Sequence, residues 1–237
     1  MTDTTLTEQA RADLAAAVPG GVRFDLGTRG LYATDASHYQ QTPAAVVTPA
    51  DEADVLATLR VCHRHKLPVT PRGAATSLSG QTFGPGVVID VSQHMEKVLQ
   101  IDHENQTCCV QPGVVRDRLN ERLKPHRLHF APDPATGNRA TVAGMIGNNS
   151  SGTRSIRYGK TSDHVLELKV ALADGTVLTL GPESAEAWRQ NSDGDSRGAR
   201  IRSGLRQLVP LTPAIAGLLA SKHDFPTDLV ATNTLCW

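Results

Sequence analysis

Small and hydroxyl-bearing residues are concentrated in one stretch between two apolar runs. Residues 73–86, GAATSLSGQTFGPG, contain four glycines and four serines or threonines. Such a stretch suits three roles. It can be a plain connecting loop, a phosphate-binding loop whose backbone N–H groups and hydroxyls donate hydrogen bonds, or a patch that another backbone approaches closely. The stretch taken alone leaves all three roles open.

Two well-known phosphate-binding patterns do not fit these residues. A P-loop requires a lysine after its last glycine, whereas Gln81 follows Gly80 here. A dinucleotide-binding turn requires a helix directly after its glycines, but only six residues separate Gly80 from the apolar run VVIDVS. If the stretch holds a phosphate, it does so between two strands, through successive backbone N–H groups.

A second stretch of small residues follows later in the chain. Residues 132–159, PDPATGNRATVAGMIGNNSSGTRSIRYG, contain five glycines and one short helical pattern near residues 141–146. Long loops inside a compact domain are usually functional or disordered. Val142, Met145, Ile146 and Ile156 supply apolar anchors, which argues against disorder. Two such loops in one domain predict a long ligand that lies against exposed backbone.

Strands alternate with helices around these stretches, which is typical of an α/β protein. Apolar runs predict strands at 44–49, 67–72 and 86–92, a hairpin over 98–111, and a second hairpin over 164–180 that turns at Asp174-Gly175. Apolar spacing predicts helices at 6–17, at 112–125 and after Thr48, the expected N-cap of a helix whose apolar face includes Val55, Leu59 and Cys62. Weaker helical patterns cover 183–190 and 199–209.

Composition excludes several classes of partner. Lysine plus arginine equals aspartate plus glutamate, at 24 each, so charge gives no argument for nucleic acid or an anionic membrane. No apolar run approaches the ~20 residues of a spanning helix, and the N-terminus lacks a signal-peptide pattern. A cytoplasmic location is therefore expected. The four cysteines, at 62, 108, 109 and 236, show no zinc spacing, so we expect buried free thiols and no metal site.

Five pieces of the sequence, in order, resemble one family. These are PRGAATSLSG, VQPGV, APDPAT, TVAGMIGNNSSGTRSIRYGKTSD and HVLELKVALADG, within residues 40–182. They are similar to the FAD-binding domain of the p-cresol methylhydroxylase and vanillyl-alcohol oxidase (PCMH-type) flavoproteins, in the branch of D-lactate, glycolate and D-2-hydroxyglutarate dehydrogenases. The resemblance implies an α+β or α/β fold of two small subdomains with FAD between them. It also implies three regions: a helical extension (1–39), the FAD-binding domain (40–215) and an unmatched tail (216–237).

The resemblance implies a set of FAD-binding residues in the two stretches. In the family the first loop wraps the pyrophosphate and the second adds flavin and diphosphate contacts, while one strand position lies near the adenine. Carried over, these positions are Arg72, Gly73, Ala74, Ala75, Thr76, Ser77, Ser79 and Gly80, then Pro132, Asp133, Thr141, Gly144, Gly147, Asn149, Ser151 and Gly152, and finally Val165.

The same resemblance sets expectations about chemistry. Some relatives bond FAD to a histidine where this chain has Thr76, so FAD is expected to bind noncovalently. The implied reaction is oxidation of a small 2-hydroxy acid, with a membrane-associated or iron–sulfur protein as electron acceptor. The GSEGTLG-like segment and the His-rich motif of the family are missing, so the chain is expected to be incomplete, to bind FAD weakly and to turn over slowly. No catalytic residue is assigned, and Arg154 and Arg157 remain either phosphate or substrate contacts or plain surface residues.

Two alternatives to this function remain open from the sequence. One is a non-catalytic or incomplete flavin-binding fragment. The other is a different flavin oxidase or reductase on the same fold.

Overall fold

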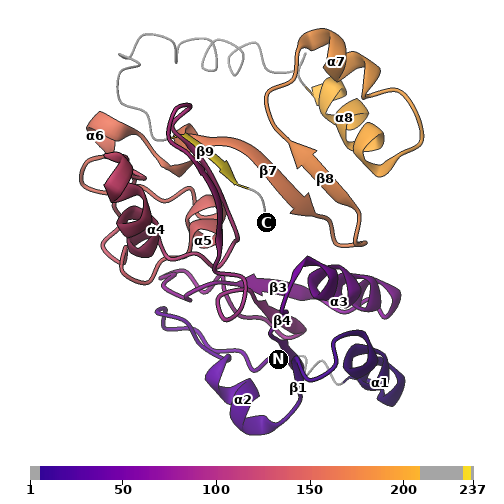
Figure 1. Ribbon diagram of the computed structural model, residues 1–237. Coiled ribbons are helices and arrows are strands. Elements are labelled where there is room, and N and C mark those ends of the chain that lie inside the picture. The colour runs from indigo at the N-terminus through magenta and orange to yellow at the C-terminus, as the bar shows by residue number, and fades with distance from the viewer. Residues whose placement is uncertain (1–5, 209–231, 236–237) are drawn as a thin grey trace. The chain divides into compact units, whose positions relative to one another are not determined.

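Two β-sheets contain the described strands, which lie within residues 22–180 and at 232–235 (Figure 1). The computed structural model describes residues 6–208 and 232–235. It divides into one unit that ends at Thr179 and also takes in the strand at 232–235, and a second unit that starts at Leu180. Both candidate loops belong to the first unit. The predicted division at residues 39 and 215 stays a prediction.

The first sheet has the strand order β1 (Val22–Arg23), β2 (Ala45–Val47), β4 (Val87–Asp90), β3 (Val69–Arg72). Strands β2 and β3 both run parallel to β4, whereas β1 is antiparallel to β2. Every residue of β2 and β4 is buried, as is usual for the inner strands of a parallel sheet. Arg72 pairs with Asp90 at the carboxyl ends of β3 and β4, where the first small-residue loop begins.

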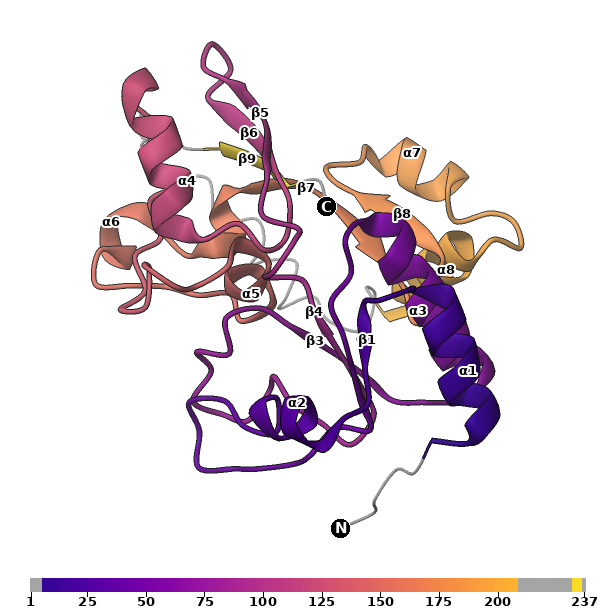
Figure 2. The same cartoon turned by 60° about the horizontal axis from the view of Figure 1, so that its bottom comes forward.

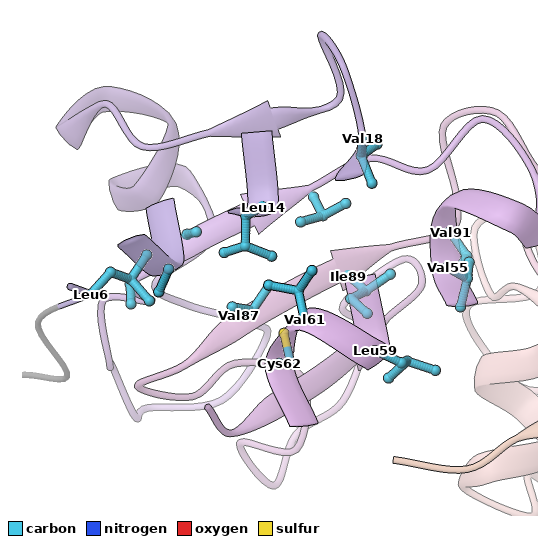
Figure 3. Packing of buried hydrophobic residues seen from close by; sticks show 14 of the residues in the cluster. Leu6, Leu14, Val18, Val55, Leu59, Val61, Cys62, Val87, Ile89 and Val91 are labelled. Atoms are coloured by element: carbon cyan, nitrogen blue, oxygen red, sulfur yellow. The ribbon is translucent and has the colours of Figure 1, made fainter. Parts of the chain in front are cut away.

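Helices α1 (Glu8–Ala17) and α3 (Glu52–Arg64) pack together and cover this sheet, and Figure 2 shows them side by side. Their buried side chains meet those of the strands in one apolar cluster, drawn in Figure 3. Leu14 of α1 is fully buried there. The predicted apolar face of Val55, Leu59 and Cys62 on α3 is confirmed, because all three are buried. This core fixes the strands from which the first loop leaves.

The predicted cap of α3 is wrong. Asp51, not Thr48, is the N-cap, and its carboxylate accepts a hydrogen bond from the Asp54 N–H at 3.1 Å. Thr48 is held instead by Gly21, whose carbonyl accepts the Thr48 N–H at 2.8 Å. The strand pairing of β1 with β2 therefore extends through Thr48, and the helix starts one short turn later.

The second sheet has the strand order β5 (Val98–Asp102), β6 (Thr107–Val110), β9 (Thr232–Leu235), β7 (Val165–Ala171), β8 (Val177–Leu180). The two predicted hairpins are present, and Gly175 in the second turn has a φ of +80°, which suits glycine. Strand β9 runs parallel to both β6 and β7 and fills the position between them.

Helices α4 (Arg116–Leu123) and α5 (Val142–Gly147) build a second core with this sheet. Phe130 and Leu119 are fully buried in it. The helix predicted over 112–125 and the helical piece predicted near 141–146 are thus confirmed. Pro125 lies in a 3-10 turn (Lys124–His126) that directly follows α4. This core positions the second small-residue loop.

Several short elements were not predicted. These are β1, β9, α2 (Leu26–Leu31), α6 (Ser155–Tyr158) and the 3-10 turn Thr161–His164. In the second unit, the weaker helical patterns correspond to α7 (Ala185–Gln190) and α8 (Arg197–Leu208), where the Arg202 guanidinium pairs with the Glu183 carboxylate at 2.5 Å. Among the described helices, none has both the length and the apolar character needed to cross a bilayer.

The cysteines follow the prediction only in part. Cys62 and Cys108 are buried, and burial raises the pKa of their thiols to about 12 and about 11. Cys109 is partly exposed, because it lies on the opposite face of β6 from Cys108. Cys236 lies outside the described residues.

Candidate functional site

The two small-residue stretches face each other across one cavity of about 460 Å³. The first stretch leaves the carboxyl end of β3, and the second surrounds the short helix α5. A cavity of this size lies within the range of about 300–1,000 Å³ that is typical of ligand pockets. The structure therefore places both loops where one ligand could contact them together, as the prediction of a long ligand requires.

The structure brings ten of the predicted residues to this cavity. Six come from the first loop and four from the second, namely Arg72, Gly73, Ala74, Ala75, Thr76, Ser77, Thr141, Gly144, Gly147 and Ser151.

Seven predicted residues do not line the cavity, and their role in binding stays a prediction. They are Ser79, Gly80, Pro132, Asp133, Asn149, Gly152 and Val165. Contacts within the chain account for several of them. The Asn149 side chain accepts a hydrogen bond from the Ser162 N–H at 3.0 Å, the Pro132 carbonyl accepts one from Arg116 at 2.9 Å, and Val165 opens strand β7.

Sequence reasoning missed eleven lining residues. They are Pro71, Gln81, Thr82, Val91, Pro134, Thr136, Ala140, Ala143, Met145, Asn148 and Ser150. Most stand directly beside a predicted residue, so a rule that took whole loops rather than selected positions would have found them. Val91 is different, because it reaches the cavity only through the parallel pairing of β4 with β3.

Gly73 and Thr141 mark the closest approach of the two loops. A Cβ built on Gly73 would overlap with the Thr141 side chain. Thr141 is buried and its hydroxyl accepts a hydrogen bond from the Gly144 N–H at 3.3 Å, which caps α5. The absence of a side chain at 73 thus lets the first loop pack against the start of α5.

Gly147 borders open space in the cavity. A Cβ built there would meet no atom within 4 Å, although Gly147 is a lining residue. Gly147 ends α5 and does not have a positive φ. The backbone therefore gives no reason for strain from a side chain at this position, and an added Cβ would meet open space.

Arg72 is the cavity's charged residue and is held tightly by the chain. Its Nη1 donates to the carbonyls of Thr34, Thr82 and Tyr32 at 2.9, 3.3 and 3.4 Å, and the guanidinium lies over the Tyr32 ring. Burial lowers the pKa of Arg72, and the nearby Asp90 carboxylate opposes that change. The group stays cationic in any case. Arg72 therefore holds three backbone carbonyls in place and also puts a positive charge at the cavity wall.

Asp133 and Gly152 stabilise the second loop from within. The Asp133 carboxylate accepts hydrogen bonds from Arg154 Nε at 2.8 Å and from the Thr153 hydroxyl at 3.2 Å, and the Arg154 guanidinium lowers the pKa of that carboxyl. A Cβ on Gly152 would overlap with Asp133. Arg154, for which the sequence left open a phosphate or substrate contact or a plain surface position, is paired with Asp133.

The cavity suits an anionic ligand. Among the described residues, its lining includes Arg72 but no aspartate or glutamate, and the hydroxyl-bearing residues Thr76, Ser77, Ser150 and Ser151 contribute to it. One positive charge, hydroxyl donors and small residues that expose backbone N–H groups are the features that hold a diphosphate. Open space beside Gly147 leaves room for such a group, so the residues present fit a dinucleotide cofactor.

Comparison with known proteins identifies the class to which this chain belongs. The model of the "FAD binding domain" family matches residues 43–181, which is more than half of the chain. The chain therefore belongs to the FAD binding domain family, and FAD is its cofactor. The match spans both small-residue loops and all the cavity-lining residues.

Individual relatives agree with this assignment. The chain is 43% identical over 192 residues to D-2-hydroxyglutarate dehydrogenase of Pseudomonas putida, covering 80% of this chain and 19% of the relative. It is 36% identical to glycolate oxidase subunit GlcD of Bacillus subtilis, covering 71% of this chain and 37% of the relative. The chain thus spans about a fifth to two fifths of the length of these relatives.

A solved structure of p-cresol methylhydroxylase with substrate bound has the same fold. The TM-score is 0.65 at 20% identity, and the alignment covers 79% of this chain and 39% of that one. The predicted PCMH-type fold, which mixes helices and sheets, is therefore confirmed.

Proposed function

We propose that this chain is the FAD-binding part of a flavin-dependent oxidoreductase that oxidises a small 2-hydroxy acid. The relatives whose names state a substrate, D-2-hydroxyglutarate dehydrogenase and glycolate oxidase, support this substrate class. When bound, the flavin supplies the acceptor for the hydride that leaves the carbon bearing the hydroxyl. The electron acceptor, a membrane-associated or iron–sulfur protein, and the cytoplasmic location belong to the same proposal.

The single observation that carries the proposal is the shared cavity of the two small-residue loops. We infer that its walls hold the diphosphate: Thr76 donates from the first loop and Ser151 from the second, while the Ser77 hydroxyl donates to the Gln81 side chain within the first loop. Arg72 adds a positive charge that offsets the negative charge of the ligand. The glycines let the ligand lie against the backbone. We assign no proton-transferring residue to the described part of the chain.

Anaerobic reduction of the bound flavin tests the substrate class. The protein, in the longest form that its gene encodes, is loaded with FAD and mixed without oxygen with D-2-hydroxyglutarate, glycolate or D-lactate. The proposal predicts loss of the visible flavin absorbance with at least one of them. A flavin that is bleached by a 4-alkylphenol and by none of the three acids would instead identify a different oxidase on this fold.

A further inference from the structure

A segment outside the cavity contacts the chain on both sides of residues 73–81 of the first loop. This segment, residues 34–37, is called the brace below. Its Thr34 carbonyl accepts a hydrogen bond from Arg72 Nη1 at 2.9 Å, and its Asp35 carboxylate accepts one from the Thr82 hydroxyl at 3.2 Å. Arg72 is the last residue of β3 and Thr82 lies inside the first loop, so the two flank residues 73–81. Arg72 also donates to the Thr82 carbonyl at 3.3 Å. The brace thus holds the chain on both sides of residues 73–81.

The brace also contacts the middle of the loop. The Ala36 N–H donates to the Ala75 carbonyl at 3.2 Å. Ala75 has a φ of +55°, a left-handed conformation that costs an alanine about 1–2 kcal/mol. Strained residues of this kind persist only where the surrounding structure determines them. A hydrogen bond at the strained residue itself identifies the brace as part of that surrounding structure.

Asp35 holds the brace in shape. Its carboxylate accepts the Ser37 N–H at 2.8 Å in addition to the Thr82 hydroxyl. Burial alone would raise the pKa of Asp35, but the hydrogen bonds from Ser37 and Thr82 outweigh it and lower the pKa. One carboxylate therefore connects the turn of the brace to the end of the loop.

The start of the brace is anchored to the first sheet. The Tyr32 hydroxyl donates to the buried Asp90 carboxylate of β4 at 2.6 Å and accepts from Gln93 Nε2 at 2.7 Å. Because β4 is a fully buried strand, this anchor is rigid. None of residues 32–37 lines the cavity, so each acts on it only through other residues.

We propose that residues 34–37 position the first loop for FAD, and that Asp35 is the positioning residue on which this depends. The inference rests on the proposed binding of the FAD diphosphate in this cavity. Asp35 does not touch the ligand; it holds Thr82 and the turn at Ser37, and these keep the loop in the conformation that lines the cavity.

Asp25 provides a matched control for Asp35. Its carboxylate also accepts a backbone N–H, that of Thr28 at 2.8 Å, and it caps α2 only a few residues before the brace. It has no contact with the first loop among its described hydrogen bonds. Both Asp25→Ala and Asp35→Ala remove a carboxylate that accepts a backbone N–H two or three residues further along the chain, so they should lower the melting temperature of the apo-protein by similar amounts.

The test is the FAD dissociation constant, measured by quenching of flavin fluorescence. Asp35→Ala should weaken FAD binding about five- to tenfold, the size expected for one lost hydrogen bond, while Asp25→Ala should leave the constant unchanged. Asp35→Asn should restore most of the affinity, because its amide can still pair with both partners. Combining Asp35→Ala with Thr82→Val should add little to either single loss, since the two residues act as a pair.

The outcomes separate this inference from the proposed function. If the wild-type chain does not bind FAD, the proposed function fails and the inference fails with it. If the wild type binds and Asp35→Ala binds equally well, or if Asp25→Ala weakens binding as much, the inference alone is wrong. Should Asp35→Ala not fold, Thr82→Val removes the same hydrogen bond from the other side, and unaltered affinity in that variant would equally overturn the inference.

Discussion

Gly73 lies directly against Thr141, so that the first loop touches the capping residue of α5. This contact joins the loop that follows β3 of the first sheet to an element of the second core. A side chain added at residue 73 would therefore overlap with Thr141 unless one of the two moved.

Replacing Gly73 by alanine should lower the free energy of unfolding by about 1–3 kcal/mol, because the new methyl group overpacks against Thr141. Urea denaturation measures this loss. Thr141→Ala should also destabilise the protein, since it removes the cap of α5. The double variant should lose less than the sum, because the smaller residue at 141 relieves the overlap. Strictly additive losses would show that the two residues do not press on each other.

Bound FAD should be released when the protein unfolds. The cavity presents Thr76 at the position that carries a flavin-linked histidine in some members of the family, and threonine does not form that bond. The holoprotein is denatured in acid and centrifuged. The yellow colour should stay in the supernatant, and colour in the protein pellet would disprove noncovalent binding.

FAD should bind at least about tenfold more tightly than FMN. The donors of both loops are best explained by a diphosphate, and a charge-assisted hydrogen bond to each phosphate contributes about 1.5–3 kcal/mol. FMN carries only one phosphate and leaves some of these donors without a partner. Parallel fluorescence titrations with the two flavins measure the ratio, and equal dissociation constants would contradict the diphosphate assignment.

The free energy of unfolding should fall at alkaline pH, because the Tyr32 hydroxyl ionises less readily in the folded protein than in the unfolded chain. Burial and the hydrogen bond to Asp90 raise the pKa of Tyr32 to about 12 from its usual value of 10. A pKa that is higher in the folded state stabilises the protein fully below pH 10, and this contribution is lost as the pH rises from 10 to about 12. The difference in unfolding free energy between wild type and Tyr32→Phe should therefore shrink across this range. A difference that stays constant would argue against the raised pKa.

The long regular elements were predictable because their apolar residues repeat with a clear period. Helix α3 shows its buried face in the sequence, and β2 and β4 show theirs as unbroken apolar runs. Helix α2 was missed because LGTRGL contains two glycines and buries no side chain, so no period marks it. Strand β9 was missed because only its partners β6 and β7 define it.

The candidate site was predictable as two loops and not as individual positions. Glycine and hydroxyl residues mark a stretch that can approach a ligand, but they also mark turns. Gly152 belongs to the second kind, since it packs against Asp133 within the second loop. The brace lay beyond prediction, because Asp35 and Thr82 are 47 residues apart in sequence and meet only in the folded chain.

The substitution Gly147→Val examines the central claim, that FAD lies in the cavity between the two loops. A valine there would occupy the open space of the cavity. Gly30→Val is the matched control: Gly30 also lies in a short helix, α2, is exposed, and has no atom within 4 Å of an added Cβ, but does not line the cavity. Gly20 would be a poorer control, because its φ of +77° strains any valine.

The deciding measurement is the FAD dissociation constant of wild type, Gly147→Val and Gly30→Val, each shown by circular dichroism to be folded. The account predicts that Gly147→Val weakens FAD binding at least about tenfold, a loss of about 1.4 kcal/mol or more, while Gly30→Val binds like the wild type. If the two folded variants retain FAD equally well, the cofactor does not lie against Gly147 and the cavity between the loops is not its site.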